Sequence, residues 1–232
     1  MIELFPEGFE ERDANGALEL AAYTERQDAA TRLGALGPVR ETGVSAGWAD
    51  AWRRFHRPVR IGPLWVGPSW EASEPGATAV VIDPGGAFGT GAHATTRLCL
   101  ELLLDVTPTG LVDVGCGSGV IAVAAAKLGF TPAVALDSDE SAVAVARANA
   151  VANGVEVDVR LADVLTDPLP DVGLAVANIA RRPVEVVAER FAGDVVIASG
   201  YLAGEQPAAE GWRSRERRVA GEWAADRFER VS

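Results

Sequence analysis

A glycine-rich stretch at Val112–Gly119 reads Val-Asp-Val-Gly-Cys-Gly-Ser-Gly and follows an apolar run. Glycine at a junction between a strand and a helix permits backbone dihedral angles closed to other residues, and it lets a ligand approach the main chain. Ligands of open parallel sheets bind at such junctions. We therefore predict that Gly115 and Gly117 contact a bound nucleotide-like molecule.

Two acidic residues follow later apolar runs. Asp137 ends the next run, 22 residues after Gly115, where a carboxylate can accept hydrogen bonds from both hydroxyls of a ribose. Asp163 follows the third run, where an acid can accept from the exocyclic amine of adenine. Asp163 fits equally well as a helix cap or a turn residue. The pattern predicts an adenosine site with Asp137 at its ribose.

Two classes of cofactor fit this pattern. Residues Gly117–Ala122 also satisfy the looser fingerprint of dinucleotide-binding loops. Asp113 favours S-adenosylmethionine, because a carboxylate beside the loop repels a pyrophosphate but can hold the methionine amino group, directly or through water. S-adenosylmethionine is therefore the predicted cofactor. A nicotinamide-dependent oxidoreductase is the alternative from another enzyme class.

A second glycine-rich loop precedes the first, at residues 83–96, and reads Asp-Pro-Gly-Gly-Ala-Phe-Gly-Thr-Gly-Ala-His-Ala-Thr-Thr. We expect this loop to cover the amino-acid end of the cofactor, with Phe88 in contact with it. The helix that follows begins with free backbone N–H groups, which suit a carboxylate, and Thr96 adds a hydroxyl. His93 either orients a substrate or bonds to the loop backbone, and the sequence does not choose between them.

Asn178 lies at the end of the fourth apolar run after residue 110, which we expect to form a strand at 173–177. Its position is over the crevice where a transferred group would be delivered. The amide oxygen can align an N–H of the acceptor while the amide nitrogen contacts the cofactor. Asparagine at the end of a strand is also a common turn former. Its combination with the other motifs favours function, and Asn178 is the predicted catalytic residue.

These motifs, in this order, resemble the ribosomal protein L11 methyltransferase family over residues 47 to about 200. The resemblance is most specific at residues 83–96, and the Trp48–Arg54 segment is similar to the family's interdomain connector. It implies a class I, S-adenosylmethionine-dependent methyltransferase acting on lysine ε-amino groups and the N-terminal α-amino group of ribosomal protein L11. The residues that align with the family's cofactor contacts are Thr96, Gly115, Asp137 and Asn178.

The sequence departs from the family pattern at three places. The family's N-terminal substrate-recognition domain resembles a ferredoxin-like module, and residues 1–45 supply too little chain for all of it, so we expect a reduced module. Ala180–Pro183 replaces a more apolar stretch, and Gly86 replaces a larger apolar residue. These departures bear on the acceptor more than on the chemistry. The alternative within the fold is a methyltransferase for another protein or for a small-molecule amine.

Hydrophobic periodicity predicts the elements that position these residues. The expected strands are 18–23, 39–44, 79–82, 111–115, 133–137, 155–160, 173–177 and 195–198, followed by two strands within 211–232 joined near Gly221. The expected helices are 24–36, 95–105, 120–128, 140–152 and 183–191, of which the fourth has Ser138 or Asp139 as its N-cap and Asn153-Gly154 as its stop.

Their alternation predicts an α/β fold, with a Rossmann-like, mostly parallel sheet that has helices on both faces. We expect a small N-terminal α/β module at residues 1–45, a helical connector at 46–60 and the methyltransferase domain at 61–232. Hydrophobic residues make up 48% of the 232 and aromatic residues only 6%, so the core must be built mainly from Ala, Val and Leu.

The net charge of −12 argues against direct nucleic-acid binding, which depends on Lys and Arg, and favours a basic protein partner. Cys99 and Cys116 match neither a metal site nor a disulfide framework. No apolar run has the length of a signal peptide or a membrane span. We expect a cytoplasmic monomer without membrane association.

Overall fold

The computed structural model describes residues 10–14, 17–21, 57–83 and 91–231. The chain divides into two compact units, residues 1–54 and 55–232. In the first unit, β1 (Glu10–Ala14) pairs antiparallel with β2 (Ala17–Ala21). The helix expected at 24–36, the strand expected at 39–44 and most of the connector lie outside the described residues. The three-part division of the chain therefore stays a prediction.

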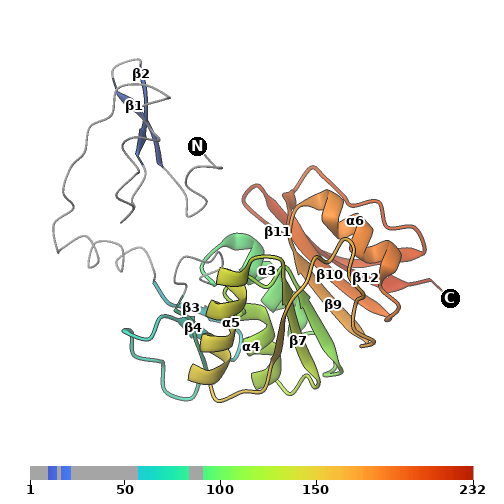
Figure 1. Cartoon of the computed structure of the whole chain (residues 1–232), viewed down its shortest axis with the longest axis horizontal. Coiled ribbons are helices and arrows are strands. Elements are labelled where there is room, and N and C mark those ends of the chain that lie inside the picture. The colour runs from blue at the N-terminus through green and yellow to red at the C-terminus, as the bar shows by residue number, and fades with distance from the viewer. Residues whose placement is uncertain (1–9, 15–16, 22–56, 84–90, 232) are drawn as a thin grey trace. The chain divides into compact units, whose positions relative to one another are not determined.

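The second unit is built on a seven-stranded sheet in the order β11-β12-β10-β9-β6-β7-β8 (Figure 1). Strands β10, β9, β6, β7 and β8 are parallel to one another. At one edge, β12 pairs antiparallel with β10, and β11 pairs antiparallel with β12. The strands are β6 (Leu111–Val114), β7 (Ala133–Asp137), β8 (Asp158–Leu161), β9 (Leu174–Asn178), β10 (Val195–Leu202), β11 (Trp212–Ala220) and β12 (Trp223–Arg230).

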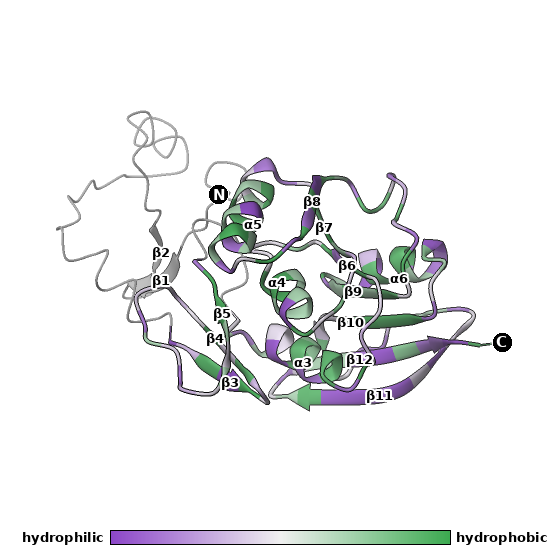
Figure 2. Ribbon diagram, turned by 90° about the horizontal axis from the view of Figure 1, so that it is seen from below, coloured by the Kyte–Doolittle hydropathy of each residue, from purple (hydrophilic) through white to green (hydrophobic). Residues whose placement is uncertain are grey.

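Helices cover both faces of this sheet. The four helices in the described part of the chain are α3 (Ala94–Leu103), α4 (Val120–Lys127), α5 (Glu140–Ala152) and α6 (Arg181–Arg190). On one face, a core joins α3 and α4 to strand residues such as Leu111 and Val176, and a smaller cluster joins α4 and α5 to Ala135. On the other face, a second large core joins α6 to neighbouring strand residues, such as Val112 and Ala175. Successive residues of a strand point to opposite faces, and helices cover both, so the central strands β6 and β9 are apolar apart from the buried Asp113 and the terminal Asn178 (Figure 2). The predicted fold class is confirmed.

A separate three-stranded sheet precedes α3. It has the order β3-β4-β5 and consists of β3 (Val59–Ile61), β4 (Leu64–Gly67) and β5 (Thr78–Val81). Of these, only the third strand was expected. The first two are short and stand in a Gly- and Pro-rich segment, which obscures their periodicity. Ile61, Leu64 and Val80 are buried in the same core as α3 and α4.

The predicted punctuation of α5 is confirmed. Asp139 is its N-cap and accepts a hydrogen bond from the backbone N of Ser141, 2.8 Å away. At the other end, Gly154 has a φ of 63°, and its N–H donates to the Val151 carbonyl. Val155 donates to the Ala150 carbonyl at 3.2 Å. This Schellman arrangement uses Val155 for the helix end, so β8 begins at Asp158 rather than at the expected Val155.

Most other boundaries differ little from the expectation, but β10, expected at 195–198, runs to Leu202. The helix expected from Pro183 begins two residues earlier, so Pro183 lies in its first turn. Backbone N–H groups of the first turn have no partner within the helix, so proline, which lacks an N–H, is tolerated there. The two strands expected within 211–232 are β11 and β12, and Gly221 lies between them with a φ of 60°. Within the described residues, no helix is long and apolar enough to cross a membrane.

Candidate active site

A cavity of about 380 Å³ opens at the carboxyl ends of β6, β7, β8 and β9. This is the edge of an open parallel sheet where ligands bind. The cavity is lined by Thr96, Gly115, Cys116, Gly117, Val120, Ile121, Asp137, Ser138, Ala162, Asp163, Val164, Leu165, Asn178, Ile179 and Pro183. The structure thus brings together the predicted site residues Thr96, Gly115, Gly117, Asp137, Asp163 and Asn178. Phe88 lies outside the described residues.

The glycine-rich loop needs its glycines for both conformation and space. Gly115 has a φ of 69° and Gly117 a φ of 53°, in the left-handed region that disfavours side chains. A Cβ on Gly115 would lie 2.4 Å from the Cγ2 atom of Ile179. The loop can therefore pass close beneath Ile179 only because residue 115 has no side chain.

The Asp137 carboxylate is held at the floor of the cavity by two backbone groups. Its Oδ2 accepts from the N–H of Gly117 at 2.8 Å, and its Oδ1 accepts from the N–H of Asp139 at 3.0 Å. Each carboxylate oxygen can accept a further hydrogen bond. The arrangement presents two oriented acceptors to the cavity, as binding of a pair of vicinal hydroxyls requires.

Asp163 combines two of the alternatives that the sequence leaves open. Its Oδ1 accepts from the N–H of Leu165 at 2.9 Å, which makes it a turn residue. It also lines the cavity, beside Ala162 and Val164. Its contact with an adenine amine stays a prediction.

Asn178 and Thr96 meet across the cavity wall. The Nδ2 atom of Asn178 donates to the Oγ1 atom of Thr96 at 3.2 Å. Thr96 is only 1% exposed, so its hydroxyl is fixed in place. The first turn of α3 is in turn capped by His93, whose Nδ1 accepts from the N–H of Thr95 at 3.4 Å. Of the two roles open to His93, the structure shows the bond to backbone.

Asp113 does not line the cavity. It is 1% exposed, and its Oδ2 accepts from the N–H of Ala122 in the first turn of α4, at 3.1 Å. Burial, together with a smaller effect of the Asp137 charge, raises the pKa of its carboxyl to about 7 against the lowering effect of the Ala122 hydrogen bond. Asp113 was expected to face a ligand beside the loop, but its carboxylate is directed into the first turn of α4 instead. A role in holding the methionine amino group stays a prediction.

Several lining residues were not predicted from the sequence. They are apolar and form walls around the polar floor, namely Val120, Ile121, Ala162, Val164, Leu165, Ile179 and Pro183. The sequence could have indicated these residues, because all of them lie a few residues beyond the carboxyl end of a predicted parallel strand. Cys116 also lines the cavity, but burial raises the pKa of its thiol, so the neutral form is favoured.

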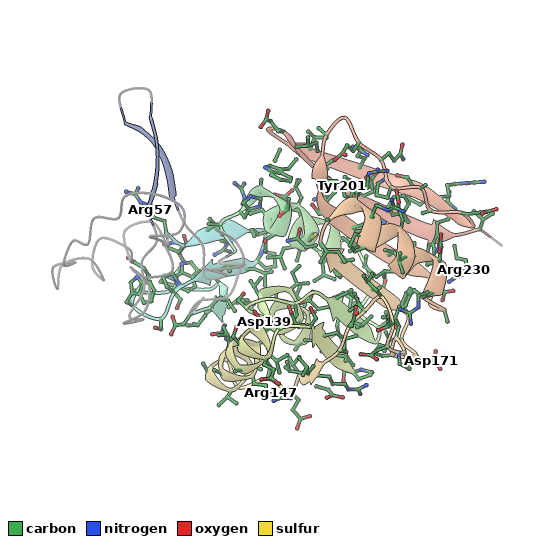
Figure 3. All side chains as sticks on the ribbon, turned by 45° about the horizontal axis from the view of Figure 1, so that its top comes forward. Arg57, Asp139, Arg147, Asp171, Tyr201 and Arg230 are labelled. Atoms are coloured by element: carbon green, nitrogen blue, oxygen red, sulfur yellow. The ribbon has the colours of Figure 1, made fainter. Side chains whose placement is uncertain are left out.

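The main chain of Ile179 lies against β10, next to a shift in that strand's pairing with β12. The register of β10 shifts between Ser199 and Tyr201, and the Ser199 carbonyl accepts from the N–H of Ile179 at 3.1 Å. A Cβ on Gly200 would lie 2.2 Å from the Ile179 carbonyl oxygen. Beyond it lies Tyr201, which is labelled in Figure 3. Its hydroxyl donates to buried Asp226 at 2.8 Å. This side of the site is therefore packed backbone against backbone.

Comparison with known proteins identifies the family. The sequence model described as "Ribosomal protein L11 methyltransferase (PrmA)" matches residues 9–225. The chain belongs to the ribosomal protein L11 methyltransferase family. The resemblance that the motifs carried is thereby confirmed.

Curated members of this family are close relatives. The chain is 43% identical over 187 residues to "Ribosomal protein L11 methyltransferase" of Symbiobacterium thermophilum, covering 76% of this chain and 62% of that protein. A protein of the same name from Pelotomaculum thermopropionicum is 44% identical over 198 residues, covering 77% and 64%. The chain thus spans less than two thirds of the length of these relatives.

Solved structures agree with the family. The structure titled as ribosomal protein L11 methylase from Lactobacillus delbrueckii subsp. bulgaricus has a TM-score of 0.69 at 28% identity, covering 76% of this chain and all 100% of that chain. A putative methyltransferase from Escherichia coli has a TM-score of 0.54 at 14% identity, covering 75% and 98%, and shows the shared fold alone.

Proposed function

We propose that this chain is an S-adenosylmethionine-dependent protein methyltransferase that modifies lysine ε-amino groups and the N-terminal α-amino group of ribosomal protein L11 in the cytoplasm. One observation carries the proposal. In a member of this family, one cavity gathers the oriented carboxylate of Asp137, the glycine loop and the amide of Asn178.

The residues of the cavity fit S-adenosylmethionine. A volume of about 380 Å³ lies within the range of small-molecule sites. Asp137 would accept from the ribose hydroxyls, and the apolar walls with Asp163 beside them suit an adenine ring. Thr96 and the first turn of α3 would hold the methionine carboxylate. Each part of the ligand would thus meet matching chemistry: an acceptor for the ribose, an apolar wall for the adenine and donors for the carboxylate.

S-adenosylmethionine would supply a methyl group on a sulfonium, a good leaving group, so no covalent intermediate with the enzyme is needed. The chain's own contribution is alignment and exclusion of water. The Nδ2 atom of Asn178 donates to Thr96, and its Oδ1 is then the atom able to accept an N–H of the amine. Apolar neighbours such as Ile179 and Pro183 favour the neutral, nucleophilic form of a lysine.

The charge of the chain fits a basic protein substrate. With a net charge of −12, the chain attracts a positively charged partner at long range. The alternative acceptors, another protein or a small-molecule amine, would use the same cavity. Membership of a methyltransferase family weighs against the nicotinamide-dependent alternative. The Asp113 carboxylate does not, because it bonds to Ala122 and does not line the cavity where a pyrophosphate would bind.

The test has two parts. Calorimetric titration with S-adenosylmethionine should show binding that Asp137→Ala abolishes and that Asp158→Ala, an exposed carboxylate paired with Arg160, leaves intact. Mass spectrometry of ribosomal protein L11 incubated with enzyme and cofactor should show added methyl groups. Binding without methylation of L11 would overturn the substrate and leave the other amines. Binding of reduced nicotinamide dinucleotide in place of S-adenosylmethionine would overturn the reaction.

A further inference from the structure

Asn149 of α5 and Asn153, the C-cap residue of the same helix, bind the last residue of β5 and the chain just beyond it. Asn153 accepts from the N–H of Val81 at 2.9 Å and donates to the Val81 carbonyl at 2.6 Å. One helical turn earlier, Asn149 accepts from the N–H of Asp83 at 3.0 Å and donates to the Asp83 carbonyl at 3.1 Å. Each side-chain amide thus forms a closed pair with one residue of the extended chain.

The geometry of helix and strand explains the match. Ile82 donates to Gly67 on β4, so the flanking Val81 and Asp83 direct their backbone groups to the other edge of β5. Their spacing along a strand is about 6.6 Å. Residues four apart on a helix rise by about 6 Å. The two amides therefore stand where a neighbouring strand would otherwise pair.

Asn149 makes one contact that Asn153 lacks. Its Nδ2 also donates to the Ser118 carbonyl of the glycine-rich loop, at 2.9 Å. The corresponding second contact of Asn153 is the Asn149 carbonyl within its own helix, at 2.8 Å. Asn149 is 3% exposed and uses both amide hydrogens and its oxygen. It joins three segments that lie far apart in the sequence.

Ser118 lies between two loop residues whose positions shape the site. The preceding Gly117 donates its N–H to Asp137, and the following Gly119 is the N-cap of α4 with a φ of 78°. A Cβ on Gly119 would lie 2.9 Å from the Cβ atom of Ala146, one turn before Asn149. The face of α5 that carries Ala146 and Asn149 therefore packs against the loop.

Not all of α5 faces this way. The side chain of Arg147, labelled in Figure 3, belongs to the side of the helix that meets β8, where it donates to the Val159 carbonyl at 2.8 Å. The bonds to the loop and to β5 come from the face with Asn149. The link between α5 and the glycine-rich loop is thus a specific one.

We propose that Asn149 is a positioning residue for the cofactor loop. It does not line the cavity. By holding the Ser118 carbonyl, it keeps the neighbouring Gly117 N–H directed at Asp137 and so maintains the carboxylate that receives the ribose. This inference rests on the proposed function, since it assigns a role within the S-adenosylmethionine site.

Matched substitutions test the proposal. Asn149→Asp and Asn153→Asp each keep the acceptor for the N–H of the paired residue, Asp83 or Val81, and lose the donor to its carbonyl. Only Asn149→Asp also loses the donor to the loop. Asn149→Ala and Asn153→Ala form a second pair, in case a buried charge prevents folding. Calorimetry with S-adenosylmethionine should show Kd raised about tenfold or more in the Asn149 variant and within about twofold of wild type in its Asn153 counterpart.

A ligand-free measurement accompanies the titration. Hydrogen exchange, followed by mass spectrometry of peptides spanning the glycine-rich loop, should be faster in the Asn149 variant and unchanged in the Asn153 variant. In turnover, KM for the cofactor should rise while kcat at saturation stays within about twofold.

Distinct results overturn distinct claims. Suppose that the wild type binds S-adenosylmethionine and that the Asn149 variant has the same affinity and the same rate of loop exchange. This result overturns the positioning role alone. Equal losses in both members of a pair also overturn it, because they reflect the shared bonds to β5. Wild type that does not bind the cofactor overturns the proposed function together with the role assigned here.

Discussion

Asn178 at the end of β9 donates to the Oγ1 atom of Thr96 in the first turn of α3, a bond of 3.2 Å between residues 82 positions apart. This bond orients the amide, so that its oxygen is the atom that can meet an acceptor amine. The hydroxyl of Thr96 is fixed because the residue is buried. The pair connects the predicted catalytic residue to the predicted cofactor site.

Loss of this orientation should slow methyl transfer more than it weakens cofactor binding. We expect Thr96→Val to lower kcat by about 100-fold, the usual effect of misaligning a reacting group. Thr96→Ser retains the hydroxyl and serves as the control, with kcat within about threefold of wild type. Steady-state methylation with saturating S-adenosylmethionine provides the measurement. Equal rates for the valine and serine variants would show that the bond to Asn178 has no part in catalysis.

Gly115→Ala should displace the cavity wall in addition to straining the backbone. The new Cβ would meet Ile179 Cγ2 at 2.4 Å, so the cavity wall must move. Gly154→Ala is the matched control, because it has a similar φ of 63° and nothing within 4 Å of a Cβ. Both variants pay about 1–2 kcal/mol for a left-handed residue. We expect only Gly115→Ala to raise the calorimetric Kd for S-adenosylmethionine, by about tenfold or more. A comparable rise in the control would rule out the steric account.

The buried carboxyl of Asp113 should give stability a pH dependence of unusual sign. Its pKa is raised from 3.8 to about 7 in the folded chain, so the native state binds the proton more tightly than the unfolded state. This contribution is fully present below about pH 4, is lost as the pH rises, and changes no further above about pH 7. Carboxylates with a lowered pKa, such as Asp139, act in the opposite direction.

Asp113→Asn isolates that contribution. Relative to wild type, the variant should gain stability as the pH rises from 4 to 7, by at most about 4 kcal/mol. Urea denaturation at a series of pH values measures the difference in the free energy of unfolding. A difference that is flat across this range, or that falls with pH, would contradict the raised pKa of the Asp113 carboxyl.

Tyr201→Phe should destabilise the sheet beside the site without abolishing folding. The Tyr201 hydroxyl donates to Asp226, which is 0% exposed and keeps Ser214 and Arg217 as partners. Removing one of three donors from a buried carboxylate should cost about 1–3 kcal/mol. Thermal or urea unfolding followed by circular dichroism measures the loss. An unchanged midpoint would mean that the remaining two donors satisfy Asp226 by themselves.

Much of the site follows from local sequence, because its residues lie at places that the sequence itself marks. Gly115 and Gly117 stand at a strand-to-helix turn, and Asp137 and Asn178 end apolar runs. In a parallel sheet the carboxyl ends of all strands share one edge, so residues that end strands must gather there. The helix caps of α5 were predictable for the same reason, since capping depends on neighbours within a few residues.

The tertiary structure alone decided which of these residues touch and which way they face. Asp113 was expected at the loop and lies inside, because its place in β6 puts it on the face that α4 covers. The bonds from Asn178 to Thr96 and from Asn149 to Ser118 depend on how helices and strands distant in the sequence pack together. Periodicity determines that a residue points inward, whereas its partner is set by the three-dimensional order of the elements.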